Sequence, residues 1–299
     1  MSTADVRTLG ATDAIPERRR GQRTVWSLFR RHRLAVAGMV VMGILIFIGI
    51  FAPLIAPHDP NAVSLANFRE PPTSEHLLGT DAQGRDVLSR IMYATRISLS
   101  VGLVAVAIYV VIGTVLGGVA GFFGGWVDSI IMRLADVILS FPAIIVIITV
   151  VSIIGPSIFN VMLVIGLLGW PPIARLVRGE FLTLRGRDFV TASESIGASS
   201  PRIIFRHILP NATTPIIVNA TFGVAQAILL EAGLSFLGLG VQPPTASWGN
   251  ILNAAQSFTL LEEMPWLWLP PGFMIVISVL AINFLGDGLR DALDPRARR

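Results

Sequence analysis

The feature that most constrains this chain is a set of long segments that contain no Asp, Glu, Lys or Arg. These segments span residues 34–57, 97–127, 137–174, 232–261 and 264–286. A helix needs about 20 mainly apolar residues to cross a bilayer, whereas a buried helix of a soluble protein rarely needs more than about 14. Only 14% of the residues are charged and the mean hydropathy is +0.70, against roughly 25% charged residues in an average soluble domain. The sequence therefore predicts an all-α membrane protein and argues against a soluble enzyme.

The number of spans follows from the turn signals inside these segments. Segment 137–174 is too long for one spanning helix, and Gly155-Pro156-Ser157 marks a turn within it. Six spans are predicted, at residues 34–56, 97–121, 132–153, 158–178, 215–238 and 269–288. An even number of spans places both termini on the same side of the membrane.

The arginines orient these spans. All 23 basic residues are arginines, and the predicted outer loops contain only Arg69, Arg85, Arg90 and Arg96. By the positive-inside rule, the N-terminal tail 1–33, the loop 179–212 and the C-terminal tail 291–299 are expected in the cytoplasm, while 57–96 lies outside. The arginines flank apolar spans without interleaved aromatic residues, so the basic balance indicates membrane orientation and no nucleic-acid partner.

Several kinds of chemistry are unsupported by the sequence. A P-loop needs a lysine on the nucleotide phosphates, and the chain has no lysine; it also has no cysteine for thiolate chemistry. Ser235 lies late in a span, but no histidine within any span could serve as its base, which weakens an intramembrane protease as an alternative. We expect no catalytic residue and no resident cofactor.

Potential metal ligands are present in the outer loop. Their spacing matches no recognised metal-site pattern, so the sequence predicts no metal site; these residues are His58, Asp59, His76, Asp81 and Asp86.

Glu231 is the ionisable residue deepest in a predicted span. Such groups are costly in a membrane and usually face a cavity or a partner. Two interpretations remain open for Glu231: a pore lining or outer gate, together with Ser235 and Phe236, or a hydrogen bond to a neighbouring helix. Three glycines in the second span, Gly113, Gly117 and Gly121, recur every four residues and predict close helix packing.

The cytoplasmic loop contains a patterned segment. Phe189, Ala192 and Ile196 fall on one helical face, and Gly197 ends that helix. A second helix is expected from a Ser200 cap to a stop at Pro210. The pair could offer an apolar ridge to a soluble partner or lie on the lipid surface.

This segment resembles the EAA loop of permease subunits from binding-protein-dependent ATP-binding-cassette importers. Ala192, Gly197 and Pro210 match that motif, while Thr191 and Ser193 replace its leading Glu and second Ala. Further motifs resemble the "C" permease of dipeptide, oligopeptide and nickel importers; they lie at residues 78–90, 234–244 and 286–295.

The resemblance implies a type I importer permease, with a MetI-like core over 97–290 and a first span, 34–56, that wraps a partner. It implies a second homologous permease, two cytoplasmic ATPase subunits that bind ATP and Mg²⁺, and an external solute-binding protein. Within a bacterial or archaeal cytoplasmic membrane, the chain would form half of a path for peptides or similar small solutes. The expected ATPase-coupling residues are Phe189, Thr191, Ala192, Ser193, Ile196, Gly197, Arg206 and Pro210.

The segment after Leu78 carries an apolar stripe that predicts a short amphipathic helix along the outer membrane surface. It ends at Arg96 and leads into the second span. Arg85 and Arg90 are candidate contacts for the binding protein, and a structural collar is the alternative. The rival function from another class is an ion-gradient-driven secondary transporter, which six spans and Glu231 would also permit.

Overall fold

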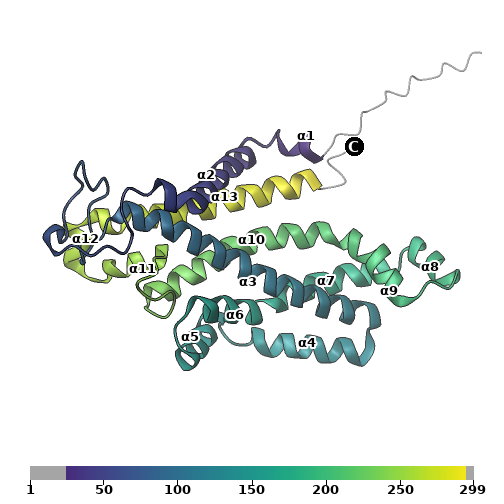
Figure 1. Cartoon of the computed structure of the whole chain (residues 1–299). Helices are drawn as coiled ribbons and strands as arrows, with labels where there is room; N and C mark the ends of the chain where they lie inside the picture. The colour runs from purple at the N-terminus through teal and green to yellow at the C-terminus, as the bar shows by residue number, and fades with distance from the viewer. Residues whose placement is uncertain (1–24, 294–299) are drawn as a thin grey trace, which may run out of the picture.

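The computed structural model describes residues 25–293, and within this range the chain is helical apart from loops and an isolated bridge between Thr80 and Asp86. The arrangement is drawn in Figure 1. The α-helices are α1 Val25–Phe29, α2 Arg33–Ile55, α3 Val87–Phe123, α4 Gly125–Leu139, α5 Ala143–Ile154, α6 Ile158–Leu168, α7 Trp170–Arg185, α8 Asp188–Ser195, α9 Ser200–Ile203, α10 Leu209–Phe236, α11 Trp248–Leu252, α12 Phe258–Glu263 and α13 Leu269–Leu293. The all-α prediction is confirmed.

Five helical segments of the described chain are long and apolar enough to cross a membrane, and these are Arg33–Ile55, Val87–Phe123, Ile158–Arg185, Ser200–Phe236 and Pro265–Leu293. Helices α4 and α5 are together long and apolar enough for a sixth span, but they are bent by 84° relative to each other. The count is therefore six only if these two helices form one broken span. The span predicted over 132–153 is thus interrupted, and the interruption lies at the Phe141-Pro142 pair. Pro142 explains the break, since its ring fixes φ and removes a backbone donor.

The outer part of α3 differs from the prediction. Residues 87–96 form the first turns of this 37-residue helix, not a separate helix along the membrane surface. Asp86 caps the helix, with its side chain accepting a 2.7 Å hydrogen bond from the Ser89 N–H. No Gly or Pro follows until Gly102, so the chain has no local signal that would stop the helix between these turns and the span.

The helix after Gly197 also runs further than predicted. Ser200 is the first residue of α9 and makes no side-chain cap, and Pro210 does not stop the helix. A five-residue π segment, Ile204–Ile208, joins α9 directly to α10, with Pro210 in the first turn of α10. Proline removes one N–H donor from this continuous segment, and the backbone pattern changes to a π turn just before it. The Asn211 side chain donates to the His207 carbonyl at 2.6 Å and thus satisfies a group in the irregular turn.

Helix α3 lies at the centre of the bundle and packs closely on α7. A Cβ atom at Gly117 would lie 2.3 Å from the Ala174 carbonyl oxygen, and one at Gly113 would lie 2.7 Å from Ile173. At Gly121 the same test gives 2.7 Å to Phe181. The predicted close-packing face is confirmed, and it belongs to the contact between α3 and α7.

The first span packs on its own chain along one narrow face. The buried residues of α2 include Ala35, Gly38 and Gly49, and a Cβ at Gly38 would lie 2.5 Å from the Ala281 oxygen in α13. Its other faces are apolar and exposed, including Ile50 at 61% and Leu54 at 79%. Such faces suit lipid or an apolar protein partner.

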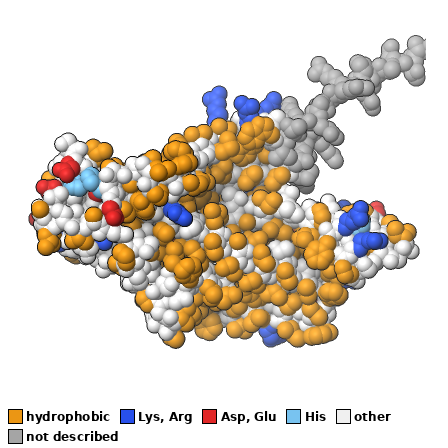
Figure 2. All heavy atoms as spheres, in the orientation of Figure 1, with side chains coloured by type: hydrophobic (Ala, Val, Ile, Leu, Met, Phe, Trp, Pro, Cys, Tyr) orange, Lys and Arg blue, Asp and Glu red, His pale blue; other side chains and the backbone are white. Residues whose placement is uncertain are grey.

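The two ends of the molecule differ in composition. Loop 57–86 gathers with α11 and α12 at one end, and α8 and α9 project at the other; α1 and the end of α13 lie toward the second end (Figure 1). Figure 2 shows hydrophobic side chains over the middle, acidic and histidine side chains at the α12 end, and arginines near α8 and α1. We call the first end the outer cap, after the side of the membrane on which the arginine distribution predicts it.

Candidate functional site

A cavity of about 640 Å³ opens between α3, α5, α7, α10 and α13. Its walls are mostly apolar, but Tyr109, Asn219, Gln226 and Asn283 supply polar groups. Asn219 and Gln226 lie seven residues apart, on one face of α10. Sequence reasoning missed this site. The available signal was the presence of amide side chains within otherwise apolar spans.

A second cavity, also about 640 Å³, continues toward the α8 end. Asn219 and Phe222 line both cavities, so the two spaces meet along α10. Glu180 and Arg290 line the second cavity, which makes it more charged than the first. Together they form a path along α10 that becomes more polar toward the end where α8 projects.

Tyr109 sets the width of the first cavity at its contact with α10. A Cβ atom at Gly223 would fall 1.6 Å from the Tyr109 hydroxyl oxygen. Glycine at this position lets the tyrosine ring lie directly against the α10 backbone, which brings the two cavity walls together.

Glu231 lies outside both cavity linings and is fully buried. The Ser235 hydroxyl donates to Glu231 Oε1 at 2.6 Å, and the Ser98 hydroxyl donates to Oε2 at 3.2 Å. Ser98 also accepts a 3.2 Å hydrogen bond from the Trp248 N–H. Of the two interpretations left open, the geometry supports the hydrogen bond between helices, because this network joins α10, α3 and α11.

Ser235 and Phe236, the other pore candidates, end α10. Ser235 Oγ accepts a 3.0 Å hydrogen bond from the Val241 N–H, which folds the following turn back on the helix. Phe236 is half-buried, and its carbonyl accepts hydrogen bonds from the side chains of Asn253 and Gln256. Both residues therefore hold α10 to the outer cap, and neither lines the cavities.

An exposed apolar surface lies at the opposite end of the molecule. Phe189 and Ile196 of the α8 segment are 41% and 85% exposed, and Phe205 of the π segment is 68% exposed. Thr191, Ala192, Arg206 and Pro210 are exposed beside them. We call this set of side chains the coupling surface, after the role that the sequence resemblance implies for it. Phe205 was missed from sequence, where only one helical face was considered.

The inner side of the same segment is firmly packed. Val190 and Ile208 are fully buried, and the Ser193 hydroxyl donates to the Phe189 carbonyl at 2.7 Å. Ser193 is thus turned inward, away from the coupling surface. Gly197 has φ +80° and open space around it, so its glycine provides the left-handed bend between α8 and α9.

Two ion pairs hold the helices that lead into this surface. Arg178 of α7 binds Asp128 of α4 through both Nε and Nη2, and Arg175 binds Asp136. Arg185 donates to the Phe122 carbonyl at the end of α3 at 2.6 Å. These contacts link α4, α7 and α3 below the coupling surface.

Arg85 and Arg90 are turned inward within the outer cap. Arg85 lies 2.7 Å from Asp81 Oδ2, and Arg90 lies 3.6 Å from the same oxygen while donating to the Pro60 carbonyl. Their side chains are only 12% and 5% exposed. This burial argues against binding-protein contacts and supports the collar alternative.

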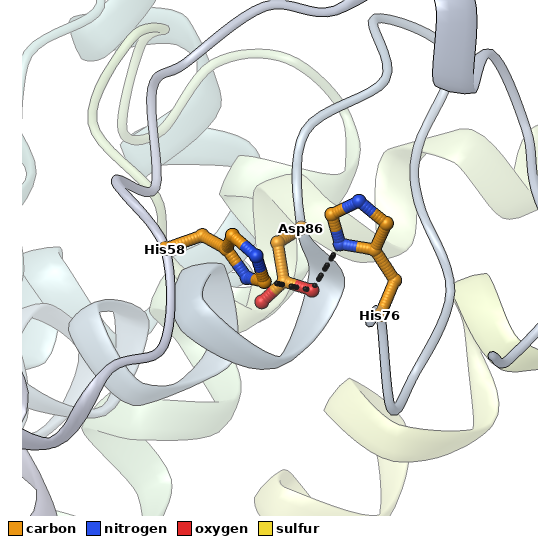
Figure 3. A group of neighbouring side chains, drawn as sticks. All are labelled: His58, His76 and Asp86. Atoms are coloured by element: carbon orange, nitrogen blue, oxygen red, sulfur yellow. Dashed lines mark hydrogen bonds and ion pairs between the residues drawn. The ribbon is translucent and has the colours of Figure 1, made fainter. Parts of the chain in front are cut away.

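The outer cap also brings together three of the five potential metal ligands. His58, His76 and Asp86 point toward one another (Figure 3). Asp59 and Asp81 do not join them: Asp59 accepts from the Asn61 N–H, and Asp81 pairs with the two arginines.

Comparisons with known proteins agree with this geometry. Residues 113–299 match the family described as binding-protein-dependent transport system inner membrane components. The chain belongs to this family. Residues 22–72 match the N-terminal transmembrane domain of oligopeptide transport permease C, which places α2 in a second recognised unit.

Similar curated proteins cover nearly the whole chain. A putative peptide permease protein of Brucella suis is 48% identical over 90% of this chain and 89% of its own length. The dipeptide transport system permease protein DppC of Alkalihalophilus pseudofirmus is 42% identical over 92% and 90%. The oligopeptide transport system permease protein OppC of Bacillus subtilis is 39% identical over 91% and 88%.

The chain is therefore a multi-pass inner membrane protein and a permease subunit of an ATP-binding-cassette importer, a transport component and not an enzyme. Membership of a binding-protein-dependent system implies ATPase and substrate-binding partners. The secondary-transporter alternative is not favoured.

Proposed function

We propose that this chain forms half of the translocation path of a peptide importer, with a second homologous permease forming the other half. Two cytoplasmic ATPase subunits would bind ATP and Mg²⁺, and an external solute-binding protein would deliver the solute. The transport step itself would use no cofactor on this chain. The family membership and the named relatives support this assignment.

The observation that carries the proposal is the continuity of one helical segment. Residues of α10 line both cavities, and α10 runs without a break through the π segment into α9 and the coupling surface. A rigid movement of the coupling surface would thus be transmitted to the cavity wall through backbone hydrogen bonds. This is the kind of rigid-body movement that alternating access needs.

A second permease subunit explains the exposed amide side chains. Asn219 and Gln226 are exposed on α10 although they lie within a candidate span. An exposed amide facing lipid would lose its hydrogen bonds to water. Facing a partner across a shared, hydrated path removes this cost, so this side of the bundle is the proposed contact with the second permease.

Peptides suit the chemistry of the first cavity. Tyr109, Asn219, Gln226 and Asn283 can donate and accept hydrogen bonds, and the lining contains no charged side chain. Such groups match peptide amides without selecting one side-chain charge. We therefore propose peptides or similar small solutes as the transported class.

The proposed topology has six spans, with α4 and α5 together as the third. Both termini and the loop 179–212 would be cytoplasmic. The arginines around α8 and α1, and the position of α1 and the end of α13 toward the α8 end, support this orientation (Figures 1 and 2).

Reconstitution tests the proposal. The chain would be placed in vesicles alone, with an ion gradient, and separately with its partner permease, ATPases and binding protein. We expect uptake of a labelled dipeptide or oligopeptide only in the full assembly with ATP. Gradient-driven uptake by the chain alone would favour the secondary transporter. ATP-driven uptake that selects a non-peptide solute would overturn the substrate assignment but not the subunit role.

Docking of the coupling surface is tested by cross-linking. A cysteine at Ala192 is expected to cross-link to an ATPase subunit, whereas one at Leu182, exposed on neighbouring α7, serves as the control. If the Ala192→Cys variant reacts only with lipid probes, the segment lies on the membrane surface.

A further inference from the structure

Three side chains from separate segments meet in the outer cap. His58 follows α2, His76 lies in the long loop, and Asp86 directly precedes α3 (Figure 3). Asp86 Oδ1 lies 3.0 Å from His76 Nδ1 and 3.8 Å from His58 Nδ1. One ligand atom from each residue lies within 4.8 Å of the others. The cluster belongs to neither the translocation path nor the coupling surface.

Asp86 is a buried carboxylate without an arginine partner. It is 2% exposed, and its Oδ2 already accepts the Ser89 N–H at the start of α3. Arg85 and Arg90, the nearest arginines in sequence, pair with Asp81 instead. Within residues 25–293, the ion-pair partners of Asp86 are two histidines. Buried carboxylates are normally paired with a cation or coordinate a metal.

The two histidines differ in their hydrogen bonding. His76 uses both ring nitrogens, with Nε2 lying 3.1 Å from Asn67 Nδ2 and Nδ1 lying 3.0 Å from Asp86. His58 Nδ1 is a buried atom without a hydrogen-bond partner. Its 3.8 Å distance to Asp86 is beyond hydrogen-bond range. In the neutral tautomer that carries its proton on Nε2, this nitrogen presents a lone pair for coordination.

We propose that His58, His76 and Asp86 bind a divalent transition-metal ion, and that Zn²⁺ fits the site. Two imidazole nitrogens and one carboxylate oxygen suit Zn²⁺ and its neighbours, whereas Ca²⁺ and Mg²⁺ require mainly oxygen ligands. Zinc bonds of about 2.0–2.1 Å place tetrahedral ligands roughly 3.4 Å apart. The two distances from Asp86 Oδ1, 3.0 and 3.8 Å, bracket that spacing.

Coordination changes the protonation of one ring. To bind the ion through Nδ1, the neutral His76 ring must be the tautomer with its single proton on Nε2: Nδ1 gives one proton to solvent and Nε2 takes one up, so no net proton is released. The Asn67 amide, turned over, presents its oxygen to that Nε2–H. The His58 side chain is 33% exposed at the edge of the cluster, and a water molecule would supply the fourth ligand. The spacing of 58, 76 and 86 along the chain gave no sign of this site, because the fold alone brings them together.

The ion would fasten the outer cap. It would tie the segment after α2, the loop at His76 and the first turn of α3 to one point. Since a metal that binds only the folded protein stabilises it by mass action, Zn²⁺ should raise the midpoint temperature of unfolding in a concentration-dependent way.

Metal titration tests the site. The full chain, purified with its partner subunits in nanodiscs and treated with chelator, would be titrated with Zn²⁺ while bound metal is counted by mass spectrometry. We expect the wild-type chain to bind one Zn²⁺ per copy. In the His58→Gln and Asp86→Asn variants this ion should be absent, because their affinity for Zn²⁺ should be at least 100-fold weaker. His58 can be replaced without loss of a side-chain hydrogen bond, and Asn at 86 still offers an oxygen to Ser89 as a helix cap.

The matched control is His207→Gln, which removes a histidine in the π segment at the other end of the molecule. It should leave Zn²⁺ binding and the Zn²⁺-dependent rise in unfolding temperature unchanged. Equal Zn²⁺ binding by wild type and His58→Gln would overturn the proposal. So would an absence of bound Zn²⁺ in the wild type, or displacement of Zn²⁺ by equimolar Mg²⁺. Zn²⁺ binding and the unfolding temperature are measured without transport, so failure of the metal-site proposal would leave the proposed transport function untouched.

Discussion

Glu231 is a single buried residue whose hydrogen bonds join several helices of the bundle. Its carboxyl oxygens accept hydrogen bonds from Ser98 of α3 and Ser235 of α10, while Ser98 holds the N–H of Trp248 at the start of α11. Trp248 is fully buried in the outer cluster of the core. The polar network is thus surrounded by apolar packing, where an unsatisfied hydroxyl is costly.

Two substitutions of Glu231 distinguish a role in helix packing from a role in gating. Glu231→Gln keeps one carbonyl acceptor and should change the free energy of unfolding little, whereas Glu231→Leu leaves buried hydroxyl groups unpaired at about 1–3 kcal/mol each. We expect a lower unfolding temperature for the Leu variant and a nearly unchanged one for the Gln variant, measured on the purified complex in detergent.

The control is Glu262→Leu, the same chemical change at an exposed position of α12. It should leave the unfolding temperature unchanged. If the Gln variant loses transport while keeping its stability, Glu231 acts in gating and the packing interpretation is insufficient.

Among the elements, α10 connects the cavity to the coupling surface. The π segment lets α9 pass into α10 across Pro210, and the outer end of α10 is fixed by Ser235 and its hydrogen bond to Val241. The one sharp bend in the coupling segment is at Gly197, where φ is +80°. Flexibility or strain at that bend would alter how α8 presents Phe189 to a partner.

Gly197→Ala tests the bend. An L-residue in the left-handed region costs about 1–2 kcal/mol, which favours a straightened bend in this variant. About 1.4 kcal/mol corresponds to a tenfold change in affinity. We therefore expect the variant to bind the ATPase subunits about tenfold more weakly. Membrane insertion should be unaffected. The measurement is ATPase affinity in nanodiscs, together with ATP hydrolysed per solute transported.

Gly186→Ala provides the matched control, because Gly186 has φ −81° and a methyl group added to it would have its nearest neighbour 4.0 Å away. This variant should bind the ATPases as wild type does. Equal affinity of both variants would show that the left-handed bend is unimportant for docking.

At the scale of the whole molecule, the two ends are built differently. The outer cap is held by the ion pairs of Asp81, the histidine cluster and the Glu231 network, while the opposite end exposes apolar side chains around α8. The apolar middle between them has the surface expected of a membrane region (Figure 2). Orientation across the membrane then decides which partner meets which end.

Thiol labelling checks the orientation, and the natural chain contains no cysteine that would interfere. Ser74→Cys in the outer cap should react with a membrane-impermeant maleimide in intact cells, whereas Ser195→Cys at the end of α8 should react only after the membrane is opened. Both serines are exposed, so accessibility to the reagent is matched. The reverse pattern would invert the proposed topology.

The sequence by itself determined the membrane class, the approximate spans and the presence of a patterned helical segment around residues 189–197. These features are local patterns. Charge-free stretches and arginine placement depend on lipid as the solvent, and the spacing of Gly113, Gly117 and Gly121 depends on the helical period. The exposed face containing Phe189 and Ile196 was also predictable, because residues on one helical face share a spacing.

Only the tertiary structure decided the partners of side chains and the courses of the irregular helices. The 84° bend between α4 and α5 and the passage of the helix through Pro210 depend on neighbours that satisfy freed backbone groups. Glu231 meets Ser98 across 133 positions of sequence, and His58 meets Asp86 across 28. Such contacts arise when helices pack, so no local spacing encodes them.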